Sequence, residues 1–270
     1  MLDKVFESAA FMDLPDRRIA ISGDWHGNLS WIRTVARAIA VLAPDVTTVI
    51  QAGDWWSDDR DVDTAFREAG VSRVCTVLGN HEPWGAISPL FAQHPGEAIR
   101  ISELQWLLPR PYRLNIGGRS ILCLGGATSI DRRYRTEGVD WWPEEAITEE
   151  MVEAAASGGP ADIMITHESP AGTPVRAVQN ILRTNPLGIP EAERLASAAS
   201  RVRVKQVWDS VMPKLLAHGH MHQPGGGVRA DGRRVASLGC DLQQGNLVFL
   251  DLKTLELEAP SLREIRAAAL

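Results

Sequence analysis

The chain has 270 residues, 44% of them apolar, and a net charge of −6 with a pI near 5.7. This composition is ordinary for a globular protein with a sizeable core, and the length allows one large α/β domain or two small ones. The acidic balance and the absence of a long Lys/Arg block argue against a dedicated nucleic-acid-binding protein.

The N-terminal residues, the lengths of the apolar runs and the cysteines together predict a cytoplasmic protein without a membrane segment. The first residues, MLDKVFESAAFMDLPDRR, lack a basic start followed by an apolar run. No stretch approaches the roughly 18 apolar residues of a membrane helix. The chain has an odd number of cysteines, and all three are widely spaced and set among apolar neighbours: Cys75, Cys123 and Cys240. We therefore expect buried thiols in a reducing compartment rather than disulfides or a zinc site.

The first part of the chain alternates short apolar strands with helices. Strands are predicted at 18–22, 46–51 and 73–78, and helices at 29–43 and 61–70. In the first helix, apolar side chains recur on one face, as an amphipathic helix requires. This alternation favours parallel strands with helices packed on the sheet.

After residue 110 the pattern changes. The strands predicted at 112–116 and 119–124 flank two glycines, which is a strong hairpin signal. Further along we predict a loop at 126–142, helices at 144–157 and 191–211 around a Pro- and Gly-rich segment at 168–190, and strands at 161–166, 215–217, 235–238 and 247–252. No repeat or linker interrupts the chain. We therefore expect one domain over 1–270, a two-sheet α/β sandwich with an N-terminal extension at 1–16.

Five short motifs directly follow predicted strands: GDWHGN (23–28), GDWW (53–56), GNHE (79–82), THESP (166–170) and HGHMH (218–222). Ligand sites of open α/β sheets assemble at the carboxyl ends of strands, and glycine allows a sharp turn there. Asp, His and Asn side chains bind divalent ions. An isolated Gly-Asp would be better explained as a helix cap or turn. Five of the seven histidines fall on motif positions, however, which favours a metal site.

The spacing within the motifs predicts two ions. Asp24 and His26 lie two residues apart, so in extended backbone their side chains point the same way and can grip one ion. His220 and His222 repeat this spacing and could serve neighbouring ions. Asp54 can give one carboxylate oxygen to each of two ions held about 3.5–4 Å apart. Two ligand carboxylates carry less negative charge than two divalent ions carry positive charge. The site is therefore net positive and attracts a phosphate.

The motifs GDxH, GDxx, GNHE, a lone His after a strand, and GHxH, in this order over residues 19–222, resemble the calcineurin-like metallophosphoesterase family. The resemblance implies a β-sandwich flanked by helices, with a dinuclear metal site at strand carboxyl ends. It implies two divalent ions, most readily manganese and otherwise iron or zinc. A hydroxide that bridges the ions would attack phosphorus in line, and His81 would face the leaving-group oxygen. The implied ligands are Asp24, His26, Asp54 and His222 for one ion, and Asp54, Asn80, His167 and His220 for the other.

One departure bears on the substrate. Protein Ser/Thr phosphatases of this family read GD-x-x-D-R-G at the second motif, where the later Asp orients the catalytic His. Here GDWWSDDRD places Ser57 at that position, which argues against a phosphoprotein substrate. The carboxylate partner of His81 stays open among Glu82, Asp58 and Asp59.

Three sets of residues outside the ligands have two interpretations each. The loop at 126–145, with Arg132, Arg133 and Arg135, is either a lid whose arginine clamps a substrate phosphate or a solvated charged loop. The tryptophans in and beside the motifs either form an aromatic wall or, for at least half of them, pack in the core. His94 is expected to be an exposed bystander and His218 a packing residue.

These observations predict a metal-dependent phosphatase or phosphodiesterase whose partner is a phosphate-ester substrate and not a membrane. One alternative is a nuclease of the same fold, for which DNA or RNA would be a partner only as substrate. A second alternative is a metal-binding scaffold without turnover, which would be expected to have lost ligands.

Overall fold

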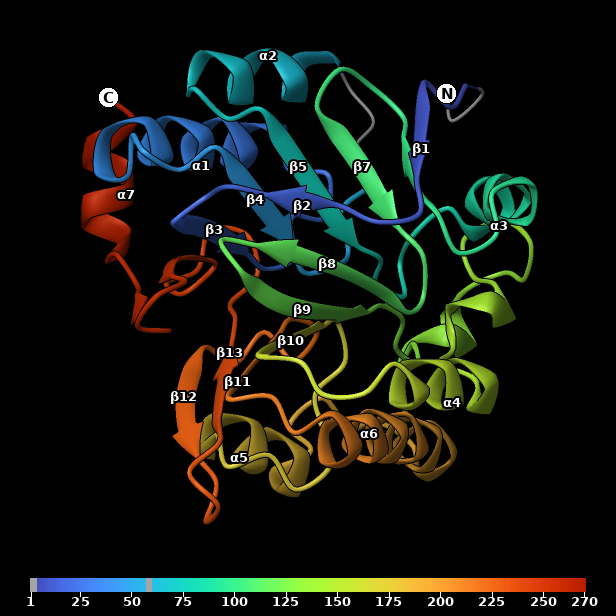
Figure 1. Ribbon diagram of the computed structural model, residues 1–270. Coiled ribbons are helices and arrows are strands. Elements are labelled where there is room, and N and C mark those ends of the chain that lie inside the picture. Colours follow the sequence, from blue (N-terminus) through green and yellow to red (C-terminus); the bar gives the residue numbers. More distant parts are fainter. Residues whose placement is uncertain (1–3, 57–59) are drawn as a thin grey trace.

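The computed structural model describes residues 4–56 and 60–270, which form two β-sheets packed face to face between two layers of helices (Figure 1). The fold class predicted from the sequence is thus confirmed. Figure 1 shows α1, α2 and α7 over the first sheet and α4, α5 and α6 over the second. No helix in the described part of the chain is long and apolar enough to cross a membrane.

The first sheet has parallel strands at its centre and antiparallel strands at its edges. Strands β3, β4, β5 and β7 run parallel, β14 joins β3 in antiparallel register, and β6 joins β7. In spatial order the strands are β1 (Glu7–Ala9), β6 (Ala98–Arg100), β7 (Gln105–Leu108), β5 (Arg73–Val77), β4 (Thr48–Gln51), β3 (Arg18–Ser22), β14 (Leu247–Asp251) and β15 (Leu257–Glu258).

The second sheet repeats this plan. Strands β9, β10, β11 and β13 run parallel, β8 is antiparallel to β9, β12 is antiparallel to β13, and the edge strand β2 is parallel to β8. In spatial order the strands are β12 (Gly225–Val228), β13 (Arg234–Ser237), β11 (Leu215–His218), β10 (Ile163–Thr166), β9 (Arg119–Leu124), β8 (Tyr112–Ile116) and β2 (Asp13–Leu14). The described part of the segment at 1–16 therefore adds one edge strand to each sheet, β1 and β2.

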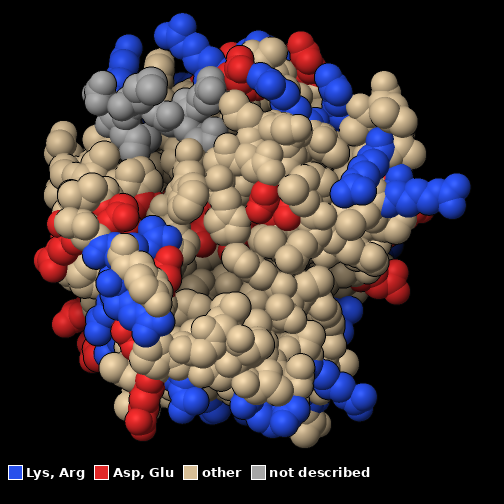
Figure 2. All heavy atoms as spheres, turned by 180° about the vertical axis from the view of Figure 1, so that it is seen from behind, with Lys and Arg blue, Asp and Glu red and all other residues tan. Residues whose placement is uncertain are grey.

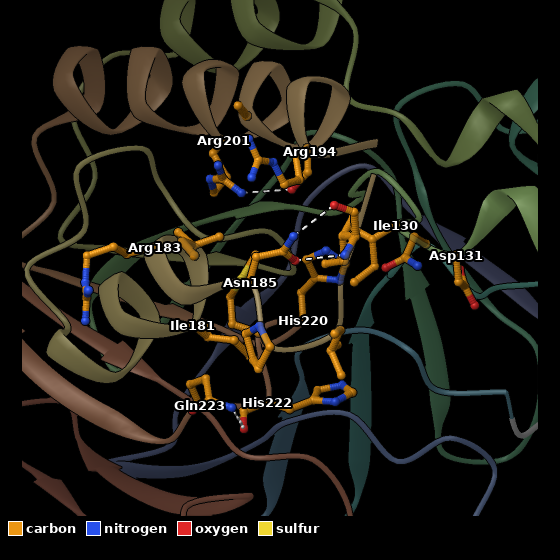
Figure 3. A pocket seen from close by; sticks show the side chains of 18 of the residues that line it. Ile130, Asp131, Ile181, Arg183, Asn185, Arg194, Arg201, His220, His222 and Gln223 are labelled. Carbon is orange, nitrogen blue, oxygen red and sulfur yellow. Dashed lines mark hydrogen bonds between the residues drawn. The ribbon is translucent and has the colours of Figure 1, made fainter. Parts of the chain in front are cut away.

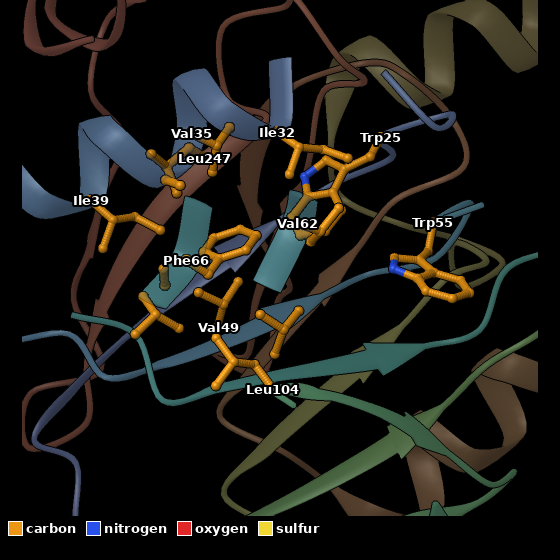
Figure 4. Close-up of a cluster of buried hydrophobic side chains, with 14 of the residues drawn as sticks. Trp25, Ile32, Val35, Ile39, Val49, Trp55, Val62, Phe66, Leu104 and Leu247 are labelled. Carbon is orange, nitrogen blue, oxygen red and sulfur yellow. The ribbon is translucent and has the colours of Figure 1, made fainter. Parts of the chain in front are cut away.

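The helices are α1 (Leu29–Leu42), α2 (Arg60–Glu68), α3 (Trp84–Gln93), α4 (Glu149–Ser157), α5 (Arg176–Thr184), α6 (Glu191–Val211) and α7 (Leu262–Ala268). Helix α1 begins where the Asn28 side chain accepts a hydrogen bond from the Trp31 backbone N–H at 3.1 Å. Its buried face, with Ile32, Val35 and Ile39, packs on β4 and α2 (Figure 4). The central strands are buried on both faces, which explains their continuous apolar runs.

Two helix predictions are wrong. The sequence predicts a helix over 144–157, but residues Pro143–Glu145 form a separate 3-10 turn and α4 begins only after its Thr148 cap. No helix is predicted in the Pro- and Gly-rich segment at 168–190, yet it contains α5. Both differences lie next to the site described below.

Candidate metal centre

The structure brings all the predicted ligands together at one end of the sandwich. They lie on loops that directly follow β3, β4 and β5 of the first sheet and β10 and β11 of the second. Two groups of ligand atoms lie within 4.8 Å of one another, Asp24 with His26 and Asp54, and Asp54 with His167 and His220. The Asn80 Oδ1 lies 2.9 Å from His167 Nε2, and His222 Nε2 lies 2.8 Å from Asp24 Oδ2.

Asp54 lies between the two groups and is 1% exposed. Its Oδ1 lies 3.4 Å from His167 Nε2, and its Oδ2 lies 3.8 Å from His26 Nε2. Burial alone would raise the pKa of this carboxyl, but the charge and hydrogen bond of His167 hold it well below its usual range. Asp54 is therefore a carboxylate that presents one oxygen to each group.

Hydrogen bonds fix which ring nitrogen of the histidines faces the centre. The His167 Nδ1–H donates to the Ala52 carbonyl at 2.7 Å, and the His26 Nδ1–H donates to Asp241 Oδ1 at 3.0 Å. In both rings Nε2 is left to bind an ion, as in many metal sites. The sequence did not reveal Asp241, because only the fold places the loop after β13 beside His26.

The ligand loops have left-handed backbone at several residues other than glycine. The φ angles are 47° at His26, 53° at Asp54, 62° at His220 and 49° at His222. This conformation costs about 1–2 kcal/mol per residue. The extended backbone predicted for Asp24 to His26 and for His220 to His222 is therefore wrong. Tight turns, held by the surrounding packing, aim these side chains instead.

The motif glycines leave space that ligands of neighbouring loops occupy. A Cβ on Gly79 would lie 2.2 Å from Asp54 Oδ1, and one on Gly219 would lie 2.3 Å from Asp24 Oδ1. A Cβ on Gly53 would likewise lie 2.2 Å from the His167 ring. The loops thus pack their polar side chains as closely as shared ions require, so the residues fit a metal centre.

Asn80 is held by a network that the sequence did not reveal. Its Nδ2 donates to Ser129 Oγ at 3.0 Å, and the Ser129 backbone N–H and hydroxyl both bond to the Glu145 carboxylate at 2.6 Å. Burial raises the pKa of Glu145. This network orients the Asn80 Oδ1 towards the centre and anchors both ends of the loop at 126–145.

His81 lies at the opening of the centre. Its backbone N–H donates to Asp54 Oδ1 at 2.9 Å, and its Nε2 lies 3.4 Å from an Arg135 guanidinium nitrogen. Burial lowers the pKa of His81, which favours the neutral imidazole. The other two arginines of this loop lie over aromatic rings, Arg132 over Trp141 and Arg133 over Tyr134. Arg135 alone of the three contacts His81 among the described residues.

Glu82 has a different role from the one considered for it. Its carboxylate accepts hydrogen bonds from the backbone N–H groups of Trp55 at 3.0 Å and Gly79 at 3.1 Å. Burial raises its pKa to about 7. Glu82 therefore ties the second motif loop to the third. The other acidic residues considered as partners of His81, Asp58 and Asp59, lie outside the described residues, as does Ser57.

Most of the tryptophans near the motifs belong to the core. Trp25 and Trp55 are buried in the cluster that packs against α1 and α2 (Figure 4), and Trp84 is buried in the same cluster, which confirms core packing for all three. Trp56 is 42% exposed, and its ring centroid lies 5.6 Å from those of His26 and His81. Trp56 therefore forms an aromatic edge beside the centre.

The cysteine prediction holds for two residues and is wrong for the third. Cys75 and Cys123 are buried, and burial raises the pKa of both thiols. Cys240 is only half-buried, and its sulfur lies within 4.8 Å of donor atoms of His26 and His222. As expected, His218 is a packing residue, since burial lowers its pKa to about 4 and keeps the ring neutral.

Comparison with known proteins agrees with this architecture. The protein TT1561 of Thermus thermophilus is 16% identical with a TM-score of 0.55, covering 92% of this chain and 100% of that one. A dimetal phosphatase from Danio rerio is 11% identical with a TM-score of 0.54, covering 92% and 97%. A search of the curated proteins found no match. The family model for calcineurin-like phosphoesterase matches residues 17–224. The chain therefore belongs to the calcineurin-like phosphoesterase family of metal-dependent phosphoester hydrolases.

Proposed function

We propose that the protein hydrolyses phosphate mono- or diesters with two divalent ions. The position of Asp54 carries the proposal, because its two oxygens face different histidines, His26 and His167. The imidazole, carboxylate and amide donors suit manganese, iron or zinc, and we expect manganese to be the most effective. One ion is held by Asp24, His26, Asp54 and His222, and the other by Asp54, Asn80, His167 and His220.

The residues around the centre have distinct roles in this proposal. When bound, two ions would supply Lewis acidity towards the phosphoryl oxygens and would lower the pKa of a water that attacks phosphorus. His81 faces the leaving-group oxygen, to which the N–H of its neutral ring can donate a hydrogen bond. The lowered pKa of His81 favours the neutral ring, so the neighbouring Arg135, which is held by Asp131 at 2.7 Å, supplies the positive charge that faces the phosphate.

The alternatives have less support. On the face shown in Figure 2, the described Lys and Arg side chains gather in separate groups near the edges, and no continuous basic strip crosses its middle. A nuclease would be favoured by such a strip beside the centre. A scaffold without turnover would be expected to lack ligands, whereas every predicted ligand lies at the centre.

The test is metal content combined with turnover. We expect metal-free protein reloaded with Mn²⁺ to bind two ions per chain and to hydrolyse 4-nitrophenyl phosphate, bis(4-nitrophenyl) phosphate or both. Binding of at most one ion would contradict the two-metal proposal. Two bound ions without hydrolysis of monoesters, diesters or single-stranded DNA would favour the scaffold, and hydrolysis of the DNA alone would favour the nuclease.

A further inference from the structure

The metal centre opens into a cavity of about 750 Å³ that is much larger than a phosphate group needs. One end is lined by the ligands Asp54, Asn80, His220 and His222 and by His81. The rest is lined by α5, the loop at 185–190 and α6. Figure 3 shows His220 and His222 on the side opposite Arg194 and Arg201 of α6. A phosphoester bound at the centre would therefore extend its organic part into this cavity.

The walls beyond the centre are mainly apolar. Three of the leucines there are unusually exposed, Leu182 at 37%, Leu187 at 69% and Leu195 at 64%. Exposed apolar side chains that gather along one cavity mark a ligand-binding surface more often than scattered ones do. The apolar lining residues are Ile130, Ile181, Leu182, Leu187, Ile189, Leu195, Ala198 and Met221.

Three arginines stand among these apolar residues. Arg183, Arg194 and Arg201 line the cavity. Burial raises the pKa of the Glu168 carboxyl, and the charge of Arg201 acts on this carboxyl to lower its pKa against the effect of burial. Arg201 donates to Ser197 Oγ at 2.8 Å, and Arg183 to Asn180 Oδ1 at 2.9 Å. Arg183 and Arg194 form no ion pair with a described carboxylate, so their charges make the cavity attractive to an anion such as a phosphoester.

We propose that the cavity binds an apolar organic group of the substrate, so that the substrate is an amphipathic phosphoester. Its phosphate lies at the metal centre, and its alkyl or similarly apolar portion lies against α5, the loop at 185–190 and α6. The inference rests on the proposed function, because it names the class of ester that this centre hydrolyses. We assign the apolar portion of the substrate to this wall because one cavity contains both the proposed metal ligands and the apolar side chains.

Turnover of a series of alkyl phosphates tests this proposal. Butyl, hexyl and octyl phosphate release alkoxides of similar basicity, so differences in kcat/KM report binding of the chain and not leaving-group chemistry. Each buried methylene contributes enough to change binding about fourfold. With Mn²⁺ and ester concentrations below micelle formation, we expect kcat/KM to rise at least about tenfold from butyl to octyl phosphate. Equal values across the series would overturn the inference.

Two variants locate the effect. Leu195→Asp places a charge on the apolar wall, and we expect it to reduce the octyl-to-butyl ratio of kcat/KM by about tenfold. Val41→Asp is the matched control, because Val41 is 61% exposed on α1 and does not line the cavity. The control should keep the ratio of the wild-type protein. An octyl preference that survives Leu195→Asp would overturn the assignment to this cavity.

Binding separates this inference from the proposed function. Octylphosphonate, which cannot be hydrolysed as an ester, should bind the Mn²⁺-loaded protein at least about tenfold more tightly than butylphosphonate, with a negative heat-capacity change. If the protein binds octylphosphonate more tightly than butylphosphonate but hydrolyses no phosphoester, the proposed function alone is contradicted. Hydrolysis of 4-nitrophenyl phosphate with equal binding of the two phosphonates would contradict the cavity inference alone.

Discussion

At the scale of single residues, the centre depends on side chains whose polar atoms each contact a different group. Asp54 faces His26 with one oxygen and His167 with the other, while its Oδ1 also accepts the His81 backbone N–H. Such a residue affects both ions when it is changed, whereas a residue on one side affects one. This difference makes the role of each ligand measurable.

Asp54→Ala should weaken both metal sites together, because it removes the oxygens proposed to bridge the ions. Asn80→Ala should empty mainly the second site, since the Asn80 Oδ1 lies 2.9 Å from His167 Nε2 of that site. Elemental analysis after equilibration at several Mn²⁺ concentrations distinguishes the two variants. Loss of a single ion in Asp54→Ala would contradict a bridging role.

His81→Ala should keep its metals and lose activity in proportion to the basicity of the leaving group. A nitrophenolate leaves readily without help, whereas an alkoxide does not, so the loss should be modest on 4-nitrophenyl phosphate and far larger on butyl phosphate. A single hydrogen-bond donor to a developing negative charge is typically worth about 10²–10³-fold. An equal loss on both esters, or loss of metal, would show that His81 is a structural or ligand residue.

Arg135→Ala should raise KM and weaken inhibition by inorganic phosphate, while metal content stays unchanged. Arg135 contacts His81, whereas Arg132 and Arg133 lie over aromatic rings of their own loop. Arg132→Ala and Arg133→Ala are therefore matched controls with the same charge change. Unchanged steady-state kinetics in Arg135→Ala would show that the loop is a solvated charged loop that does not bind the substrate phosphate.

At the scale of elements, the sequence predicted best where burial alone decides the structure. The bounds of β3, β8, β9 and α6 agree with prediction, because their apolar patterns and flanking turns are local signals. The start of α4 was missed because Glu145 turns inward to bind Ser129, a contact made only in the folded chain. Helix α5 was missed because Pro and Gly surround it, and its Val178 is buried in the core beneath the second sheet.

The candidate site divides in the same way. The ligands could be named from their motifs because their chemistry restricts the residue type. The turns at His26 and His220, the support from Asp241 and the cavity formed by α5 could not be predicted. Those features arise where segments distant in sequence meet, and no local pattern encodes them.

A cluster on α6 should make stability depend on pH. Partial burial would raise the pKa of Asp209, but hydrogen bonds from Lys205, Arg229 and Arg233 lower it to about 2. Because the folded pKa lies below the reference value of 3.8, the cluster stabilises the fold above about pH 4 and loses this effect as the pH falls towards 2.

Asp209→Asn should therefore lower the Tm of the metal-free protein at pH 7, and the difference from wild type should shrink between about pH 4 and 2. Thermal unfolding in EDTA over this range measures it. Glu153→Gln, at an exposed carboxyl of α4, is the control and should leave the Tm unchanged at pH 7. A difference that stays constant down to pH 2 would contradict the pKa explanation.

At the scale of the whole molecule, the metal centre joins the two sheets. Its proposed ligands follow strands of both sheets, so ions bound there would connect β3, β4 and β5 to β10 and β11. Ions that bind the folded chain and not the unfolded one stabilise it by mass action, by about 2.7 kcal/mol at a concentration of 100 Kd.

Removing the metals should thus lower the Tm of the wild-type protein, and adding Mn²⁺ back should restore it in a concentration-dependent way. Asp54→Ala is the informative comparison, since its Tm should hardly respond to EDTA or Mn²⁺. Differential scanning calorimetry with and without EDTA makes the measurement. The same Tm for metal-free and metal-loaded wild type would show that the centre does not link the sheets energetically.

The pairing of β3 with β14 has a consequence for synthesis of the chain on the ribosome. β3 is complete at residue 22, but its antiparallel neighbour β14 begins only at residue 247. At about 5–20 residues per second, translation leaves that edge of β3 unpaired for roughly 10–45 s. An apolar strand edge exposed for so long can pair with other nascent chains. Recovery of properly folded protein should therefore depend on chaperones that bind the growing chain before residue 251 emerges.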